Sequence, residues 1–159
     1  MRNYLTALGL LLSIGLSAQS HQIKKHSGET LDVNFIKFEN DILHYSPDGS
    51  KEEVKISKHA VAYVHDNQNA TKDYISNKVT ITSKEDFDKV VIIDSDESLG
   101  LNDQKSIEIY QGVHKGGTTH FTNPAIVRRL KYKSAELGYP FIRIVSKKDG
   151  KYSAIAYNY

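Results

Sequence analysis

A glycine-rich segment flanked by two histidines contains the residues of this chain that are best suited to ligand binding. It extends from Gln111 to Phe121, and its central residues are His114, Lys115, Gly116, Gly117, Thr118, Thr119 and His120. Backbone N–H groups, two hydroxyl groups and one ammonium group could hold a small anion in a concave nest. The Gly-Lys-Ser/Thr order of a phosphate-binding P-loop is absent, so a mobile loop or hairpin tip is the alternative interpretation. We therefore predict a ligand-binding loop over residues 112–121.

The two histidines of this loop are also the candidate metal ligands. His114 and His120 could share a metal ion, with Glu108 or Asp103 completing its ligand shell, because imidazole nitrogens and carboxylate oxygens both bind zinc. Their spacing matches no short metal-binding motif, so exposed loop histidines are the alternative interpretation. The other histidines are scattered, and we expect surface or strand positions for them: His21, His26, His44, His59 and His65. The sequence predicts no bound cofactor.

The acidic segment Asp94-Ser95-Asp96-Glu97 is a second oxygen-rich cluster. Such clusters can bind Ca²⁺, but the spacing of an EF-hand, with its glycine and closing glutamate, is absent. We expect a polar turn that follows a buried strand.

No residue pattern of a known catalytic class is present. A serine or threonine nucleophile needs a histidine base that a third group orients. The chain has neither the Gly-x-Ser-x-Gly elbow of hydrolases nor the His-Glu-x-x-His motif of zinc proteases. The sequence therefore predicts no catalytic residue and a non-enzymatic function.

The first residues have the three-part pattern of a secretory signal peptide. A basic start at Arg2 precedes an uncharged run from Tyr4 to Leu16, and small residues follow at Ser17 and Ala18. A membrane anchor would need about 20 apolar residues, and this run is shorter. We predict cleavage near Ala18, with a cut one residue later as the alternative, and a periplasmic or secreted mature chain without a transmembrane span.

Composition limits the partners of the mature chain. Arg2 is the one charged residue of the first 18, so the remainder keeps 20 of the 21 Lys and Arg residues against 19 Asp and Glu. This balance argues against a general electrostatic attraction to nucleic acid or anionic lipid. The chain has no Cys, so it folds without disulfides. The oligomeric state is left open.

Residues 19–65 have the pattern of a β-rich module, a meander or small barrel. Apolar residues alternate with polar ones over short runs that turn residues separate. We expect strands near Ile23 and over Thr30–Phe35, Ile42–Tyr45, Val54–Ile56 and Ala60–Val64. The polar residues 66–77 lack periodicity, and we interpret them as a linker or long loop.

Residues 78–159 have the pattern of an α+β module with one main helix. The expected strands are Lys78–Thr82, a doubly buried Lys89–Ile93, Ser106–Tyr110, Phe141–Val145 and Tyr152–Tyr157, the last two joined by a turn at Asp149-Gly150. A helix over about 122–137 would begin at a cap on Thr122 or Asn123, with Pro124 in its first turn, and end at Gly138. Its apolar stripe includes Ile126, Leu130 and Leu137. An antiparallel or mixed sheet with one helix is α+β architecture.

Part of the second module resembles a known group of proteins. The matching residues are Gly100-Leu101, Lys115-Gly116-Gly117-Thr118-Thr119, Leu130-Lys131, Ala135, Gly138 and Ala156-Tyr157. They are similar to small exported α+β domains of uncharacterised Bacteroidetes proteins. The helix–strand part resembles, more distantly, small bacterial α+β domains labelled as heavy-metal-binding and the related periplasmic stress-sensor lipoproteins. The resemblance implies a fold and an exported location, and it implies no activity.

These observations favour a non-catalytic exported protein that binds or scaffolds an envelope protein or glycan. A metal- or small-anion-binding protein that uses residues 112–121 is the second hypothesis. A hydrolytic enzyme without a recognisable motif is the third.

Overall fold

The computed structural model describes residues 20–110, 124–148 and 151–159. Several sequence-based expectations fall on the other residues. They are the signal peptide 1–18, the loop 112–121 with both of its histidines, the helix caps Thr122 and Asn123, and the turn Asp149-Gly150. These expectations lie outside the described residues.

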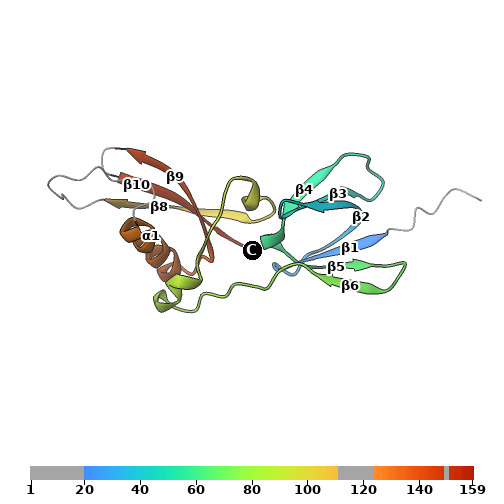
Figure 1. Ribbon diagram of the computed structural model, residues 1–159, viewed down its shortest axis with the longest axis horizontal. Helices are drawn as coiled ribbons and strands as arrows, with labels where there is room; N and C mark the ends of the chain where they lie inside the picture. Colours follow the sequence, from blue (N-terminus) through green and yellow to red (C-terminus); the bar gives the residue numbers. More distant parts are fainter. Residues whose placement is uncertain (1–19, 111–123, 149–150) are drawn as a thin grey trace, which may run out of the picture.

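The first part of the chain forms an antiparallel sheet of six strands, on the right in Figure 1. Its order is β4-β3-β2-β1-β5-β6, so β1 to β4 form the expected meander and β5 returns to pair with β1. A 3₁₀ turn, η1 (Lys58–Ala60), connects β4 to β5. The strands are β1 (His21–Lys25), β2 (Thr30–Glu39), β3 (Ile42–Pro47), β4 (Val54–Ser57), β5 (Val61–Asp66) and β6 (Thr71–Tyr74). We call this part the N-terminal lobe.

Apolar alternation explains the core of the N-terminal lobe. Ile23 of β1 lies opposite Leu31 of β2 on one side and Val64 of β5 on the other. The buried residues of this core are Ile23, Val33, Leu43, Tyr45, Ile56, Ala60, Val61 and Val64. Asn40 and Asp41 join β2 to β3 with φ angles of 51° and 64°. A two-residue hairpin turn needs positive φ at both positions, which Asn and Asp tolerate.

The second part of the chain forms a four-stranded mixed sheet and one main helix, on the left in Figure 1. The sheet order is β7-β9-β10-β8, with β7 parallel to β9 and the other neighbours antiparallel. The elements are η2 (Lys84–Lys89), β7 (Val91–Ile92), η3 (Asp96–Ser98), β8 (Asn102–Tyr110), α1 (Pro124–Glu136), β9 (Phe141–Lys148) and β10 (Lys151–Asn158). The expected α+β class is confirmed. We call this part the C-terminal lobe.

Helix α1 covers one face of this sheet as its sequence predicts. Ile126 and Leu130 are buried in the C-terminal core together with Tyr152, Ala154 and Ala156 of β10. The helix ends before Gly138, whose φ of 79° is the left-handed conformation that glycine adopts without strain. The expected stop is therefore confirmed.

The structure corrects two expectations around the connection between the lobes. Residues Lys78–Thr82 form no strand. Val79 packs on one apolar cluster and Ile81 on another, and the N–H of Val79 donates to the hydroxyl of Tyr159 at 2.7 Å. Alternation here reflects two separate contacts rather than strand pairing. The expected linker 66–77 contains the strand β6, because Asp66 Oδ1 accepts from the N–H groups of Gln68 and Asn69 and turns the chain back on β5.

The expected strand Lys89–Ile93 is also shorter than predicted. Only Val91 and Ile92 form β7, and Lys89 belongs to η2. Val90 and Ile93 are buried, but the side chain of Ile92 is 41% exposed. Because Ile92 is exposed, one face of β7 is open to solvent, and the strand is not buried on both faces as expected.

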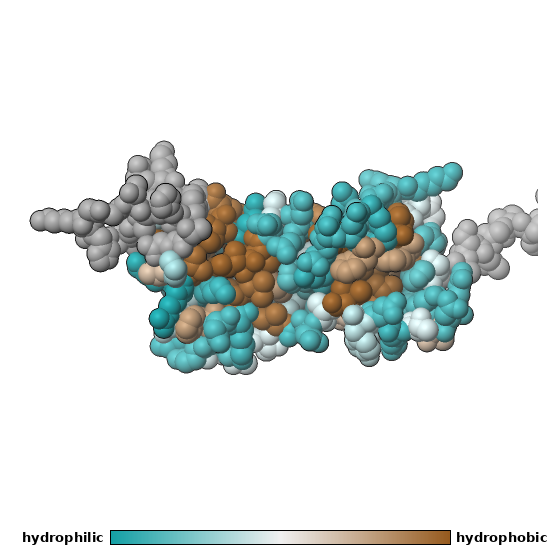
Figure 2. All heavy atoms as spheres, in the orientation of Figure 1, coloured by the Kyte–Doolittle hydropathy of each residue, from teal (hydrophilic) through white to brown (hydrophobic). Residues whose placement is uncertain are grey.

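A third apolar cluster, the junction cluster, joins the lobes. Its buried members are Ile93, Phe141 and Tyr157, and its partly buried members are Val79, Val91, Leu101, Ile155 and Tyr159. Leu101 also packs on the N-terminal core, and the ring of His59 in η1 lies 5.3 Å from that of Phe141. The C-terminal end of the described chain lies between the lobes (Figure 1). In the face that Figure 2 shows, hydrophobic surface gathers over each lobe separately, with hydrophilic surface between.

Backbone contacts fix the same region. The N–H of Ser57 donates to the carbonyl of Leu99 at 3.0 Å. Gly100, at a φ of 82°, lies so close to Ile56 that an added Cβ would be 2.5 Å from its Cγ1 atom. The lobes therefore meet in van der Waals contact.

None of the helices among the described residues has the length and apolar character needed to cross a bilayer.

Candidate functional site: a polar pocket between the lobes

The residues of the predicted ligand-binding and metal sites lie largely outside the described part of the chain. The loop His114–His120 lies outside them, and Glu108, its candidate carboxylate partner, is exposed on β8. Asp103 lies near the start of the same strand. Within residues 20–110, 124–148 and 151–159, no three His, Asp or Glu side chains are grouped as a metal site requires. The metal site at His114 and His120 therefore stays a prediction.

The acidic segment 94–97 forms a turn after β7, as expected. The carboxylate of Glu97 accepts from the N–H of Asp94 at 2.8 Å and faces His59 Nε2 at 3.5 Å. These contacts hold η3 against η1 at the junction. The segment thus has a structural role that its composition did not reveal.

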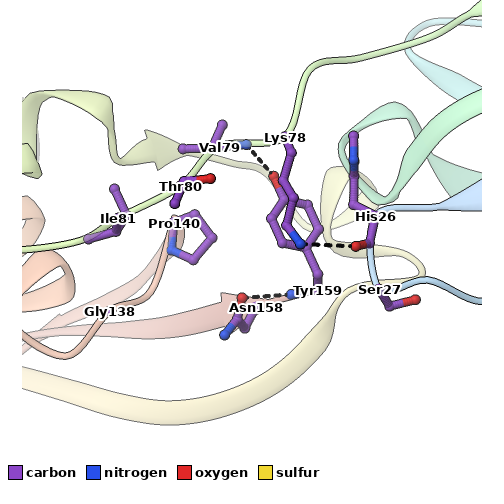
Figure 3. Close-up of a pocket in the computed structure, with 10 residues that line it drawn as sticks. All are labelled: His26, Ser27, Lys78, Val79, Thr80, Ile81, Gly138, Pro140, Asn158 and Tyr159. Carbon is purple, nitrogen blue, oxygen red and sulfur yellow. Dashed lines mark hydrogen bonds between the residues drawn. The ribbon is translucent and has the colours of Figure 1, made fainter.

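A pocket of about 380 Å³ lies where the lobes meet. It is bounded by the turn after β1, the connection between the lobes, the turn after α1 and the end of β10 (Figure 3). In this view the N-terminal lobe forms one side and the C-terminal lobe the other, with Lys78 and Tyr159 between them. The lining residues are His26, Ser27, Lys78, Val79, Thr80, Ile81, Gly138, Pro140, Asn158 and Tyr159. We call it the junction pocket.

Tyr159 forms the aromatic wall of the pocket and is held at several points. Its hydroxyl accepts from Val79 N–H at 2.7 Å, and its backbone oxygen accepts from Asn102 Nδ2 at 2.9 Å. Its ring makes edge contacts with the rings of His26 at 5.1 Å and Phe141 at 5.3 Å. Burial raises the pKa of the Tyr159 phenol, so the hydroxyl stays protonated. The ring and hydroxyl of Tyr159 are therefore uncharged and held in place before any ligand arrives.

His26 is neutral near pH 7, and its hydrogen bonds assign its tautomer. Its Nε2 atom lies 2.9 Å from the hydroxyl of Ser76, and that hydroxyl donates to the carbonyl of Val61 at 2.8 Å. A serine hydroxyl has one proton, so with the Ser76 proton in the bond to Val61 the compatible tautomer has Nε2 of His26 as the donor. Burial, and next the charge of Lys78, lower the pKa of His26.

Lys78 supplies the positive charge of the pocket. Its Nζ atom donates to the carbonyl of His26 at 3.2 Å and lies 5.3 Å from the centre of the Tyr159 ring. An ammonium group has three donors, so this long bond leaves it capable of binding an anion. Among the described residues that line the pocket there is no carboxylate side chain to neutralise it.

Two other hollows are less suited to a ligand. One of about 400 Å³ is lined by side chains of both charge signs, among them Lys37 and Glu39, which pair with each other. The other, of about 300 Å³, lies between β8 and α1, which the undescribed residues 111–123 connect. The junction pocket combines a lysine that has no Asp or Glu among the lining residues with an aromatic ring that hydrogen bonds hold in place.

Sequence reasoning did not find the junction pocket. His26 was expected to be a surface or strand residue, and Lys78 to Ile81 were expected to be a strand. No local spacing relates His26 to Tyr159, because the two meet only when the lobes pack together. The residues around His26 have only the polar composition of an ordinary turn, which does not indicate a ligand site.

Comparisons with known proteins return nothing: no protein-family model matches the chain, and no curated protein or solved structure shows significant similarity to it. The chemistry of the pocket is therefore the basis for inferring function.

Proposed function

We propose that this chain is an exported, non-catalytic binding module of the cell envelope that holds its ligand in the junction pocket. The observation that carries the proposal is the construction of this pocket from both lobes and their connection, around a volume of about 380 Å³. Ligand sites often lie between domains and have volumes of about 300–1,000 Å³. Because the walls are already ordered, the protein loses less conformational entropy when a ligand binds.

The pairing of Ser76 with His26 supports binding rather than hydrolysis. A serine nucleophile is activated when a histidine accepts its proton. Here the proton of Ser76 is donated to the carbonyl of Val61, and His26 is the donor to Ser76. A serine that uses its proton in the bond to Val61 is not activated as a nucleophile by the histidine. The contact with Ser76 instead anchors the His26 ring beside Tyr159.

The exported location remains a proposal based on residues 1–18. Cleavage after Ala18 would remove none of the described strands, because β1 begins at His21. Intact-mass and N-terminal sequencing of the protein from envelope and cytosolic fractions of its host test this part. We expect a mature N-terminus at Gln19 or one residue later, and a full-length cytosolic pool would contradict export.

Amide NMR of the mature chain tests the binding site. The probes are neutral sugars, sugar acids, amino acids and short peptides. We expect at least one probe to shift the amide signals of Val79, Thr80 and Asn158, which line the pocket. A folded spectrum in which no probe moves these signals would contradict the proposal.

Two lysine variants form a matched pair for this test. Lys78 Nζ lies 5.3 Å from the Tyr159 ring in the pocket, and Lys72 Nζ lies 5.0 Å from the Tyr63 ring on the N-terminal lobe. Lys78→Met should weaken binding, whereas Lys72→Met should leave it unchanged. Equal losses in both variants would place the ligand elsewhere.

A further inference from the structure

We infer that the junction pocket takes a small polyhydroxylated carboxylate, the chemistry of a uronic acid. This inference rests on the proposed function and adds the ligand class. Three properties of the pocket lead to it: its charge, its flat apolar walls and its neutral polar groups.

The charge of the pocket favours an anion. Lys78 is the residue with a full positive charge among the described lining residues, and His26 is neutral because burial lowers its pKa. The present acceptor of Lys78 Nζ is a neutral carbonyl at 3.2 Å. If a ligand carboxylate replaced this carbonyl, the hydrogen bond from Lys78 would be shorter and charge-assisted, and such bonds are about twice as strong as neutral ones.

The walls of the pocket suit a ring with apolar faces and polar edges. Tyr159 and Pro140 present cyclic, largely apolar side chains that Figure 3 shows beside the same space. A pyranose ring has C–H groups on its faces and hydroxyl groups around its edge. The faces can pack against Tyr159 and Pro140 while the edge meets polar groups.

Neutral hydrogen-bonding groups complete the site. The hydroxyls of Ser27 and Thr80 and the amide of Asn158 line the pocket. Hydroxyls both donate and accept, and an amide offers two donors and an acceptor, so they can pair with sugar hydroxyls in several orientations. Asn158 Oδ1 accepts from Tyr159 N–H at 2.9 Å, which fixes the amide and directs its NH₂ group away from that bond.

A phosphate ligand fits these groups less well than a carboxylate. Phosphate sites use several backbone N–H groups at a helix N-terminus or a bidentate arginine. The lining residues include no arginine, and the helical residue nearest to them in sequence is at the C-terminal end of α1. One lysine matches the single negative charge of a carboxylate.

Isothermal titration calorimetry of the mature chain with D-glucuronate and D-glucose tests the inference. The two sugars share ring and hydroxyl pattern and differ at the carboxylate. We expect glucuronate to bind at least about ten-fold more tightly than glucose, the change that about 1.4 kcal/mol produces. Lys78→Met should remove this difference, and Lys72→Met should retain it. The methyl glycoside of glucuronate distinguishes a sugar acid within a glycan from the free acid, because the glycoside binds only if the anomeric carbon is accessible.

The outcomes separate the inference from the proposed function. Equal affinity for glucose, or no affinity for glucuronate while an amino acid or peptide shifts the pocket amides, overturns the ligand class and leaves a binding pocket. A Thr80→Val variant adds a second check that does not touch the charge. It should weaken the binding of glucuronate and of glucose by the same factor. Unchanged affinity for both sugars would contradict a role for the Thr80 hydroxyl in binding sugar hydroxyls.

Discussion

The lobe cores and the junction are stabilised by different means. Each core is built from aliphatic residues that alternate along strands or recur along a helix, such as Leu43 in one lobe and Leu130 in the other. The junction instead combines aromatic rings with two histidines, His26 and His59, and with backbone bonds between distant segments. A core stabilises one lobe, whereas the junction determines whether both lobes unfold together.

Among the substitutions considered, Phe141→Ala should have the largest effect on how the two lobes unfold. Phe141 is fully buried in the junction cluster and contacts His59 and Tyr159. Truncation of a buried phenylalanine costs about 3–5 kcal/mol. Because the lost contacts include the one with His59 of the N-terminal lobe, we expect calorimetric melting to change from one transition to two.

Leu130→Ala is the control within a core. Leu130 is fully buried under the helix, and the change should cost about 2–5 kcal/mol. It should destabilise the C-terminal lobe while contacts at the junction remain. If Leu130→Ala separates the transitions and Phe141→Ala does not, the junction cluster is not what couples the lobes.

Two glycines permit a sharper comparison between crowded and open positions. Gly100 at the junction and Gly138 after α1 have similar φ angles, 82° and 79°. Alanine in this conformation costs about 1–2 kcal/mol at either position. At Gly100 the new Cβ would also lie 2.5 Å from the buried Ile56, whereas nothing lies within 4 Å of it at Gly138.

Gly100→Ala should therefore be the more destabilising of the two. The expected cost is about 1–2 kcal/mol at Gly138 and, with overpacking of typically 1–3 kcal/mol, about 2–5 kcal/mol at Gly100. Urea denaturation of both variants measures the difference. Equal midpoints would show that Ile56 and its neighbours move aside and that the lobes are not tightly packed there.

The same contrast explains which features the sequence could predict. The strands around Ile23, Val33 and Leu43 were predicted because alternation is a local signal. The helix over Ile126 and Leu130 was predicted for the same reason, and Gly138 marked its end. Strand β6 was missed because its residues are all exposed and leave no apolar pattern.

The junction and its pocket could not be predicted in the same way. Val79 and Ile81 alternate like a strand, yet one packs on the junction cluster and the other on the C-terminal core. The pocket needs His26 and Tyr159, which come from opposite ends of the described chain. Such contacts depend on how two lobes pack, which no local periodicity contains.

Acid should weaken the folded protein through the two junction histidines, with a smaller effect than the core substitutions. Burial is the main reason that the pKa of His59 is lowered from its ordinary value of 6.5, and the charge of Lys58 adds to it while Glu97 opposes it. Burial likewise lowers the pKa of His26. Below the ordinary value the unfolded chain therefore binds protons that the folded chain does not.

Stability should consequently decrease as the pH falls through about 6.5, and it should level off once the pH is below the folded-state pKa values. Thermal melts between pH 8 and pH 5 measure this dependence. His59→Phe keeps a ring beside Phe141 and removes one titrating group, so its dependence on pH should be shallower than that of the wild type. Glu97→Gln removes a charge that favours protonated His59, so its dependence should be steeper. If the stability of the His59→Phe variant depended on pH as steeply as that of the wild type, protonation of His59 would not oppose docking of the lobes.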